Sequence, residues 1–283
     1  MLANYLIGLR EGLEAGLIVG ILFAYLRKLD RRDLAPRLWI GIGVAVLVSL
    51  GTGAILTWGP YGLSFQAQEI LGGGLSILAV GLVTWMIFWM ASHARSLKGE
   101  LQSRLDLAVA GSGIGIVILG MVSVGREGVE TALFIWATVA STGSAVAGTV
   151  AALLGILTSS AIAYLIYRGS LRINLGRFFT WTGGFLIIVA AGVLLYGIGD
   201  LQEAGVLPGF GQQAFSLAAV IPPSSWYGTL LQGLFNFTPE PTWAQVTAWL
   251  LYLVVVGALF LSRALLRRPV TVAALPVDAR QAA

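Results

Sequence analysis

The sequence predicts an all-α integral membrane protein with seven transmembrane helices. Of its 283 residues, 57% are hydrophobic and 11% are charged, which is too apolar for a soluble domain. Apolar runs of roughly 20 residues recur along the chain, and each is long enough to cross a bilayer core of about 30 Å as a helix. The predicted spans are residues 2–26, 38–58, 69–92, 112–138, 145–167, 179–199 and 243–262.

The N-terminal run is predicted to be a true span, because it has no basic segment before it and is too long for a cleaved signal peptide. The chain has no cysteine, which excludes disulfides and thiolate metal sites.

The basic residues predict the orientation of the spans. Apart from Arg10 and Arg126, every Lys and Arg lies in residues 27–37, 95–104, 168–177 or 263–280. The alternate loops contain none; they are residues 59–68, 139–144 and 200–242. By the positive-inside rule the N-terminus is outside and the C-terminus is cytoplasmic. We therefore attribute the net charge of +4 to orientation in the plasma membrane (the inner membrane in a bacterium) and exclude nucleic-acid binding.

The motif Arg-Glu-x-x-Glu occurs twice inside the apolar runs. Its residues are Arg10, Glu11 and Glu14 in the first span and Arg126, Glu127 and Glu130 in the fourth. The first span runs inward and the fourth runs outward, so the motifs are expected on antiparallel helices. This arrangement predicts an inverted repeat, a common plan in transporters that bind substrate near the membrane midplane.

We predict one transmembrane domain over residues 1–268. Its parts are a first repeat over about 1–106, a second repeat over about 107–199, an outer loop over 200–242 and a seventh helix over 243–262. Within the outer loop, the apolar stretches 214–221 and 226–237 are too short to span. They are expected to be interfacial or re-entrant segments that cover the outer mouth. The remaining residues, 269–283, are predicted to be a disordered cytoplasmic tail.

Within each motif the two glutamates are three residues apart and share a helix face, and the arginine four residues before the second glutamate can pair with it. If the two helices cross at their motifs, four carboxylates converge and two arginines offset half of their charge. Ser123 and Thr131 flank the second motif with hydroxyl groups. Such a cluster suits a hard multivalent cation such as iron, manganese, magnesium or calcium.

A purely structural role for the motifs is the less favoured alternative, because each charge costs roughly 2.5–3.5 kcal/mol at the membrane centre. A zinc site is also disfavoured, since the only histidine, His93, lies at the cytoplasmic end of the third span.

Four acidic residues are predicted on the outer side, where no basic residue accompanies them: Glu69, Asp200, Glu203 and Glu240. The first three are the possible entry residues for a cation. They could attract cations to an outer mouth, or they could be ordinary solvated carboxylates. In the third span Met86 and Met90 alternate with Trp85 and Trp89, a stripe for which we favour packing over a soft-metal site. No nucleotide-binding motif is present, so transport driven by ATP on this chain is not expected.

The two motifs resemble the hallmark of the oxidase-coupled iron permease family, which includes fungal high-affinity iron permeases and bacterial EfeU. The resemblance covers most of the chain, including residues 82–90, 172–176 and 203–205. It implies uptake of iron, as Fe²⁺ or Fe³⁺, into the cytoplasm, with Glu11, Glu14, Glu127 and Glu130 as ligands. It also implies a membrane-embedded transporter that is not an enzyme and has no bound organic cofactor.

Partners outside the membrane are implied as well. Bacterial relatives work with a haem peroxidase-like and a cupredoxin-like protein, and fungal relatives work with a multicopper ferroxidase. This chain departs from the family pattern at Gly72, one turn after Glu69, where relatives often carry a second acid.

The residues alone leave three other functions open. The chain could transport Mn²⁺, Mg²⁺ or Pb²⁺, it could be a membrane-embedded carboxylate-iron enzyme, or it could be an assembly subunit that transports nothing. The shortage of histidine makes the enzyme the weaker alternative.

Overall fold

The computed structural model describes residues 2–60, 62–93, 97–111, 113–142, 145–169, 175–222 and 224–265. The described part is almost entirely helical, and its one isolated β-bridge joins Gln213 to Thr242. The predicted tail 269–283, residues 172–174 of the family resemblance and the side chain of His93 lie outside the described part.

Seven long helices of the described chain occupy the seven predicted spans. They are α1 (Leu2–Lys28), α2 (Ala35–Trp58), α3 (Phe65–His93), α5 (Ile114–Thr142), α6 (Ala145–Tyr167), α7 (Leu175–Glu203) and α9 (Trp243–Leu265). The boundaries agree to within a few residues. One correction concerns the outer loop, which we predicted to begin at residue 200. Helix α7 continues to Glu203, so its connection to α9 begins at residue 204, four residues later than predicted.

Five of the helices, α2, α3, α6, α7 and α9, are long and apolar enough to cross a membrane by length and composition. Helices α1 and α5 are as long, but every 18-residue window in them contains at least three charged side chains. Those charges are the two motifs. The fold therefore shelters them within the protein, because a charged side chain facing lipid is strongly unfavourable.

Two shorter helices complete the fold. Helix α4 (Leu97–Ala110) joins α3 to α5 and packs on α1 and α5, near the short 3₁₀ helix η1 (Arg32–Leu34). We did not predict α4, because its high content of polar residues resembles a loop. Its apolar side chains Leu101 and Leu105 are nevertheless buried, at 5% and 0% exposure.

Helix α8 (Trp226–Phe235) coincides with one of the two short apolar stretches of the outer connection. The Ser225 hydroxyl caps it by accepting a hydrogen bond from the Gly228 N–H at 3.0 Å. At its other end Asn236 adopts a left-handed conformation and donates its side-chain N–H to the Gly192 carbonyl of α7 at 2.9 Å. The second stretch, residues 214–221, forms turns and no helix, so only one of the two stretches is helical.

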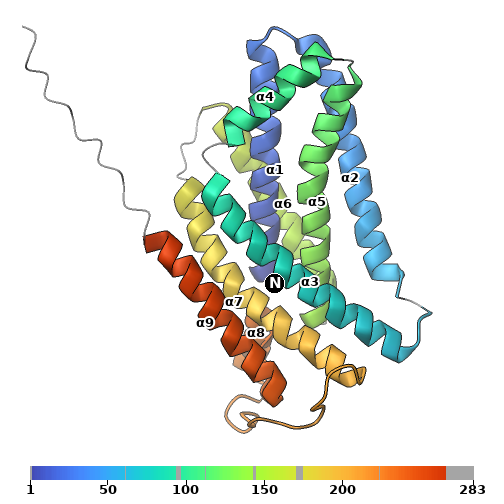
Figure 1. Ribbon diagram of the computed structural model, residues 1–283, viewed down its shortest axis with the longest axis vertical. Coiled ribbons are helices and arrows are strands. Elements are labelled where there is room, and N and C mark those ends of the chain that lie inside the picture. The colour runs from blue at the N-terminus through green and yellow to red at the C-terminus, as the bar shows by residue number, and fades with distance from the viewer. Residues whose placement is uncertain are drawn as a thin grey trace, which may run out of the picture.

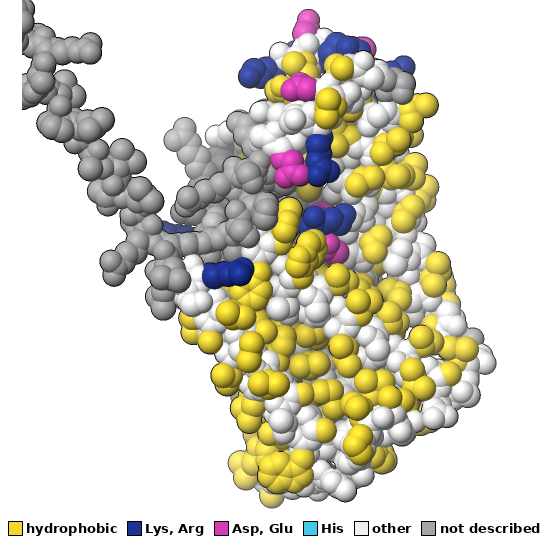
Figure 2. Space-filling model, in the orientation of Figure 1, with side chains coloured by type: hydrophobic (Ala, Val, Ile, Leu, Met, Phe, Trp, Pro, Cys, Tyr) yellow, Lys and Arg dark blue, Asp and Glu magenta, His cyan; other side chains and the backbone are white. Residues whose placement is uncertain are grey.

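Figure 1 shows α1, α2, α5 and α6 as an upper bundle, with α3, α7 and α9 running obliquely below it. The most extensive contacts join α1 to α6, α5 to α2, and α3 to α7, and α1 also packs against α5. Figure 2 shows Lys and Arg side chains gathered toward the upper part of this face, around α4 and the α1–α2 connection, while apolar side chains cover the lower part. This distribution agrees with the charge asymmetry of the sequence.

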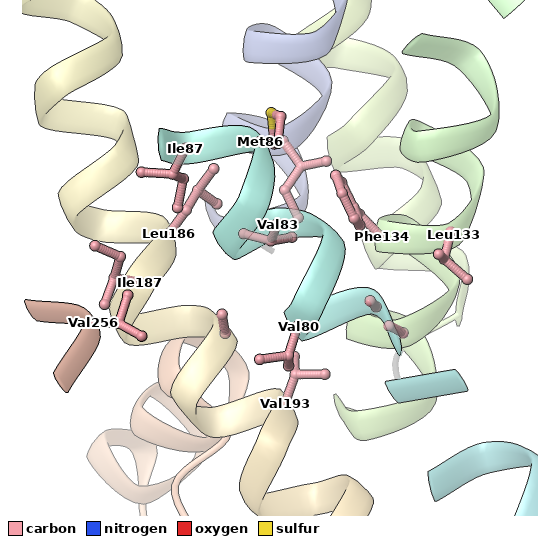
Figure 3. Close-up of a cluster of buried hydrophobic side chains, with 14 residues drawn as sticks. Val80, Val83, Met86, Ile87, Leu133, Phe134, Leu186, Ile187, Val193 and Val256 are labelled. Atoms are coloured by element: carbon pink, nitrogen blue, oxygen red, sulfur yellow. The ribbon is translucent and has the colours of Figure 1, made fainter. Parts of the chain in front are cut away.

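Two apolar clusters lie on either side of the motifs. The first packs α3 between α5 and α7 and includes Val83, Phe134 and Leu186 (Figure 3). The second lies at the α4 end. Along α1 the first cluster contains Ile7 and the second contains Ile18, so Arg10, Glu11 and Glu14 fall between them. The order of the clusters is reversed along α5, so the two helices are antiparallel there.

Candidate metal centre

The glycine inside each motif lets a second helix approach its backbone. A Cβ atom added to Gly12 of α1 would overlap the Ser159 hydroxyl of α6. A Cβ atom added to Gly128 of α5 would overlap the Ser49 hydroxyl of α2 in the same way. Small residues at such positions allow close helix packing in membranes. These contacts fix the helices that carry the charged side chains, and sequence spacing alone did not pair either glycine with its serine.

Three motif carboxylates from two helices converge. Glu11 and Glu14 of α1 and Glu127 of α5 each place a carboxylate oxygen within 4.8 Å of the others. All three residues are buried, with exposures of 1%, 3% and 4%. Carboxylate oxygens bind hard cations at roughly 2.0–2.6 Å, so oxygens at this separation can close around a single ion.

Several oxygens in this group lack a hydrogen-bond partner. They are both carboxylate oxygens of Glu11, Oε2 of Glu127 and Oε1 of Glu14, the last of which has an ion pair with Arg10. Buried polar atoms are nearly always hydrogen-bonded, and leaving one unsatisfied is unfavourable. A cation bound between the carboxylates would satisfy these oxygens, so the geometry fits a metal ion.

The fourth predicted ligand, Glu130, is buried nearby but lies outside the set of three. Its Oε1 accepts a hydrogen bond from Nε of Arg126 at 3.1 Å. The same Nε lies 3.5 Å from Oε1 of Glu127, and Nε of Arg10 lies 3.3 Å from Oε1 of Glu14. Both arginines thus pair with the glutamate four residues later, as the spacing predicts.

The two arginines differ in their surroundings. Arg10 is almost fully buried, and its guanidinium lies 5.9 Å from the ring centre of Phe179 on α7. The Arg126 side chain is 34% exposed, and its guanidinium lies 4.5 Å from the ring of Trp89 and 5.5 Å from that of Trp85 on α3. The sequence favours packing as the role of these two tryptophans. Their spacing of one turn was visible in the sequence, but their contact with Arg126 depends on how α3 crosses α5.

The predicted hydroxyl groups lie on opposite sides of the carboxylates. The Thr131 hydroxyl donates to the Glu127 backbone carbonyl at 2.6 Å and lines a cavity of about 730 Å³. Ser123 lines a smaller cavity of about 160 Å³. The larger cavity also contacts Glu11, and the smaller one contacts Glu14. Within the described chain, Glu127 is the one residue that lines both.

Glu69, Asp200 and Glu203 form a separate acidic cluster where α3 begins and α7 ends. The Asp200 carboxyl group lies within hydrogen-bonding reach of Glu69 and of the Tyr196 hydroxyl, and Glu203 acts on it electrostatically. A Cβ atom at Gly72 would lie 2.8 Å from Oδ2 of Asp200. A second acid at position 72 would therefore crowd Asp200. Tyr196 was missed because nothing in the sequence separates it from other aromatic residues of α7.

Comparison with known proteins agrees with the family resemblance. The model of the FTR1 iron permease family matches residues 1–272. The ferrous iron permease EfeU of Escherichia coli O6:K15:H31 (strain 536 / UPEC) is 34% identical over 257 residues, which cover 90% of this chain and 93% of the relative. The protein of the same name from Yersinia pestis is 33% identical over 263 residues, covering 92% and 93%. No solved structure matches the chain.

These relatives are named as permeases, so the chain is a transporter rather than an enzyme. With its five strongly apolar helices, it is a multi-pass protein of the plasma membrane. The family model matches nearly the whole chain, both motifs included, and the resemblance seen in the sequence is confirmed. The protein therefore belongs to the FTR1 iron permease family.

Proposed function

We propose that this protein takes up ferrous iron, moving Fe²⁺ from the outside into the cytoplasm through the carboxylates of its two motifs. The observation that supports this most is the convergence of Glu11, Glu14 and Glu127 in the protein interior, with oxygen atoms that lack partners. The names of the EfeU relatives support the choice of metal.

The charge of the centre favours a divalent ion. When the four glutamates and two arginines of the motifs are ionised, they leave a net charge of minus two. An ion of charge plus two would neutralise it, which matters in a membrane interior where an unbalanced charge is costly. The arginines also hold the carboxylates in place when no ion is bound, since each is within 3.3 Å of its glutamate.

The positions of the basic residues support a topology of seven spans with the α4 end in the cytoplasm. In this orientation the acidic cluster of Glu69, Asp200 and Glu203 is outside. The larger cavity would then be the outer route, because it is lined by Trp58 near the end of α2 and by Thr149 near the start of α6. We propose that the acidic cluster attracts the ion and that Glu11 and Glu127 receive it through this cavity.

Three pairs of equivalent contacts support an inverted repeat that relates α1–α3 to α5–α7. In each pair, a contact of α1 is matched by the equivalent contact of α5. Helix α1 packs on α6, while its counterpart α5 packs on α2. Gly12 lies against Ser159, while Gly128 lies against Ser49. The arginine of α1 faces an aromatic ring of α7, while the arginine of α5 faces rings of α3. Rocking of one repeat against the other would expose the carboxylates alternately to the two sides.

Uptake of radioactive Fe²⁺ into proteoliposomes tests the proposal. Glu127→Gln preserves shape but removes one charged ligand, and losing a charged contact of this kind costs about 1.5–3 kcal/mol or more. We therefore expect iron binding to weaken by roughly 10–100-fold at least, with uptake lost at low iron. Glu240→Gln, an exposed carboxylate of the outer connection, serves as the control and should transport normally.

Two further comparisons sharpen this test. Glu130→Gln should impair uptake less than Glu127→Gln, because Glu130 is held by Arg126 outside the set of three. Equal loss in both variants would instead support four ligands. Competition by Mn²⁺, Mg²⁺ and Pb²⁺ identifies the preferred ion, and normal uptake by Glu127→Gln would refute the site.

We also propose that proteins outside the membrane oxidise or deliver the iron. The family resemblance supports this part of the proposal. Adding candidate extracytoplasmic proteins to the proteoliposome assay and measuring the change in apparent iron affinity would test it.

A further inference from the structure

The smaller cavity extends from the motif carboxylates toward α4. One end of it is lined by Glu14 and Glu127, both more than nine-tenths buried. Oε2 of Glu127 has no hydrogen-bond partner. The other end is lined by Glu100 and Arg104 of α4, whose side chains are 44% and 57% exposed. The cavity thus links buried, unsatisfied carboxylate oxygens to a partly solvated ion pair.

The volume of the cavity is sufficient for a hydrated path. A volume of about 160 Å³ corresponds to roughly five water molecules at about 30 Å³ each. Ser123 and Arg126 of α5 also line the cavity and add polar groups to its wall.

The apolar side chains of helix α4 obstruct other paths by which an ion could leave the central site at this end of the bundle. Leu105 of this helix does not line the cavity and belongs to the apolar cluster that includes Leu22 of α1 and Ile116 of α5. An ion moving past these side chains would lose its hydration without gaining ligands. The rim formed by Glu100 and Arg104 is therefore the polar side of α4.

The ion pair on α4 resembles the motifs in its chemistry. Nη2 of Arg104 lies 2.6 Å from Oε1 of Glu100, and the two residues are four apart on one helix. A cation arriving through the cavity would be attracted to Glu100. Arg104 would compete for the same carboxylate and so would weaken retention of the ion.

We propose that the smaller cavity is the route by which iron leaves the central site, and that Glu100 receives the ion at its rim while Arg104 promotes its release. This inference rests on the proposed function. It assigns a role in transport to a helix that lies outside both motifs.

The test separates iron binding from iron movement. Glu100→Gln should bind Fe²⁺ in purified form with a Kd within about twofold of the unchanged protein, because Glu11, Glu14 and Glu127 are intact. Its maximal uptake rate in proteoliposomes should fall by about tenfold with little change in KM, a loss equivalent to about 1.4 kcal/mol in the transport barrier. Exchanging the charges in the double variant Glu100→Arg, Arg104→Glu should restore most of the rate.

Asp33→Asn is the matched control. Asp33 is an exposed carboxylate near the same end of the bundle, 3.2 Å from Arg31, and it does not line the cavity. This variant should transport at the normal rate. Glu100→Asp retains the charge, serves as the second variant if Glu100→Gln does not insert, and should keep most of the rate.

The outcomes distinguish the two proposals. If the unchanged protein moves no iron, the proposed function fails. If it moves iron and Glu100→Gln moves it equally fast, or Asp33→Asn is equally slow, the role of Glu100 is refuted while the central site stands.

Discussion

Replacing Gly12 by alanine should force α1 away from α6, and replacing Ser159 by glycine in the same protein should restore the fit. The new Cβ atom would overlap the Ser159 hydroxyl oxygen and would lie 3.1 Å from Ser159 Cβ and 3.3 Å from Ile156 Cα. Carbon atoms in ordinary contact are about 3.5–4.0 Å apart. Rotating the hydroxyl group aside removes only the first of these contacts, so the helices must separate by a few tenths of an ångström.

The expected loss of stability follows from three contributions. Overpacking of this kind costs about 1–3 kcal/mol. Turning the Ser159 hydroxyl away also breaks its 2.7 Å hydrogen bond to the Ile156 carbonyl, at a cost of about 1 kcal/mol. Alanine gains up to about 1 kcal/mol over glycine in helix propensity. The net destabilisation by Gly12→Ala is therefore about 1–3 kcal/mol. In the double variant Ser159→Gly lowers the helix propensity of α6, which partly offsets the gain from Gly12→Ala on α1.

The assay is thermal unfolding of the detergent-purified protein, followed by the fluorescence of its nine tryptophans. Gly81→Ala on α3 is the control, since nothing lies within 4 Å of a Cβ atom built there. Gly12→Ala should lower Tm by several degrees, the control should not, and the double variant should return close to the parent. If Gly12→Ala is as stable as Gly81→Ala, the close contact between α1 and α6 does not exist as described.

Three other predictions address the route and the centre. Because the chain has no native cysteine, a single introduced cysteine reports the solvent accessibility of its position. Ser49→Cys in the larger cavity should react with a membrane-impermeant thiol reagent added outside, and Ser123→Cys in the smaller cavity should react with reagent added inside. Reaction of both variants from the same side would contradict a route that enters by one cavity and leaves by the other. Arg126→Lys keeps the positive charge but removes the guanidinium group that lies 4.5 Å from the ring of Trp89. Loss of this cation–π contact, worth about 0.5–2 kcal/mol, should raise the KM for iron uptake about 2–30-fold. An unchanged KM would show that the contact does not matter for transport. Asp200→Asn should raise KM at low ionic strength without changing the maximal rate, and the difference should shrink in high salt because salt screens the attraction of the outer cluster.

The helical framework could be predicted from the sequence because a membrane leaves the chain few choices. Backbone groups in lipid must be satisfied within a helix, so each apolar run of about 20 residues becomes a helix of matching length. In the part of the chain that the structure describes, each of the seven predicted runs is occupied by a helix. The ends of α3 and α7 differ because helices can continue into the interface, where hydropathy no longer marks the boundary. Helix α4 was missed because its stability comes from packing Leu101 and Leu105, which local composition does not reveal.

The sequence alone also determined which residues could form a metal site, since Glu11, Glu14, Glu127 and Glu130 are charges placed inside apolar helices. It could not determine how they meet. The tertiary structure sets Glu130 apart with Arg126, places Trp89 beside that arginine and makes Glu127 the residue common to both cavities. These relations depend on how α1, α3 and α5 pack together, and on the contacts that hold α1 against α6 and α5 against α2. Those contacts join segments far apart in the sequence, such as Gly12 with Ser159 and Gly128 with Ser49. Spacing along one helix fixes which side chains share a face, but only packing between helices decides what that face meets.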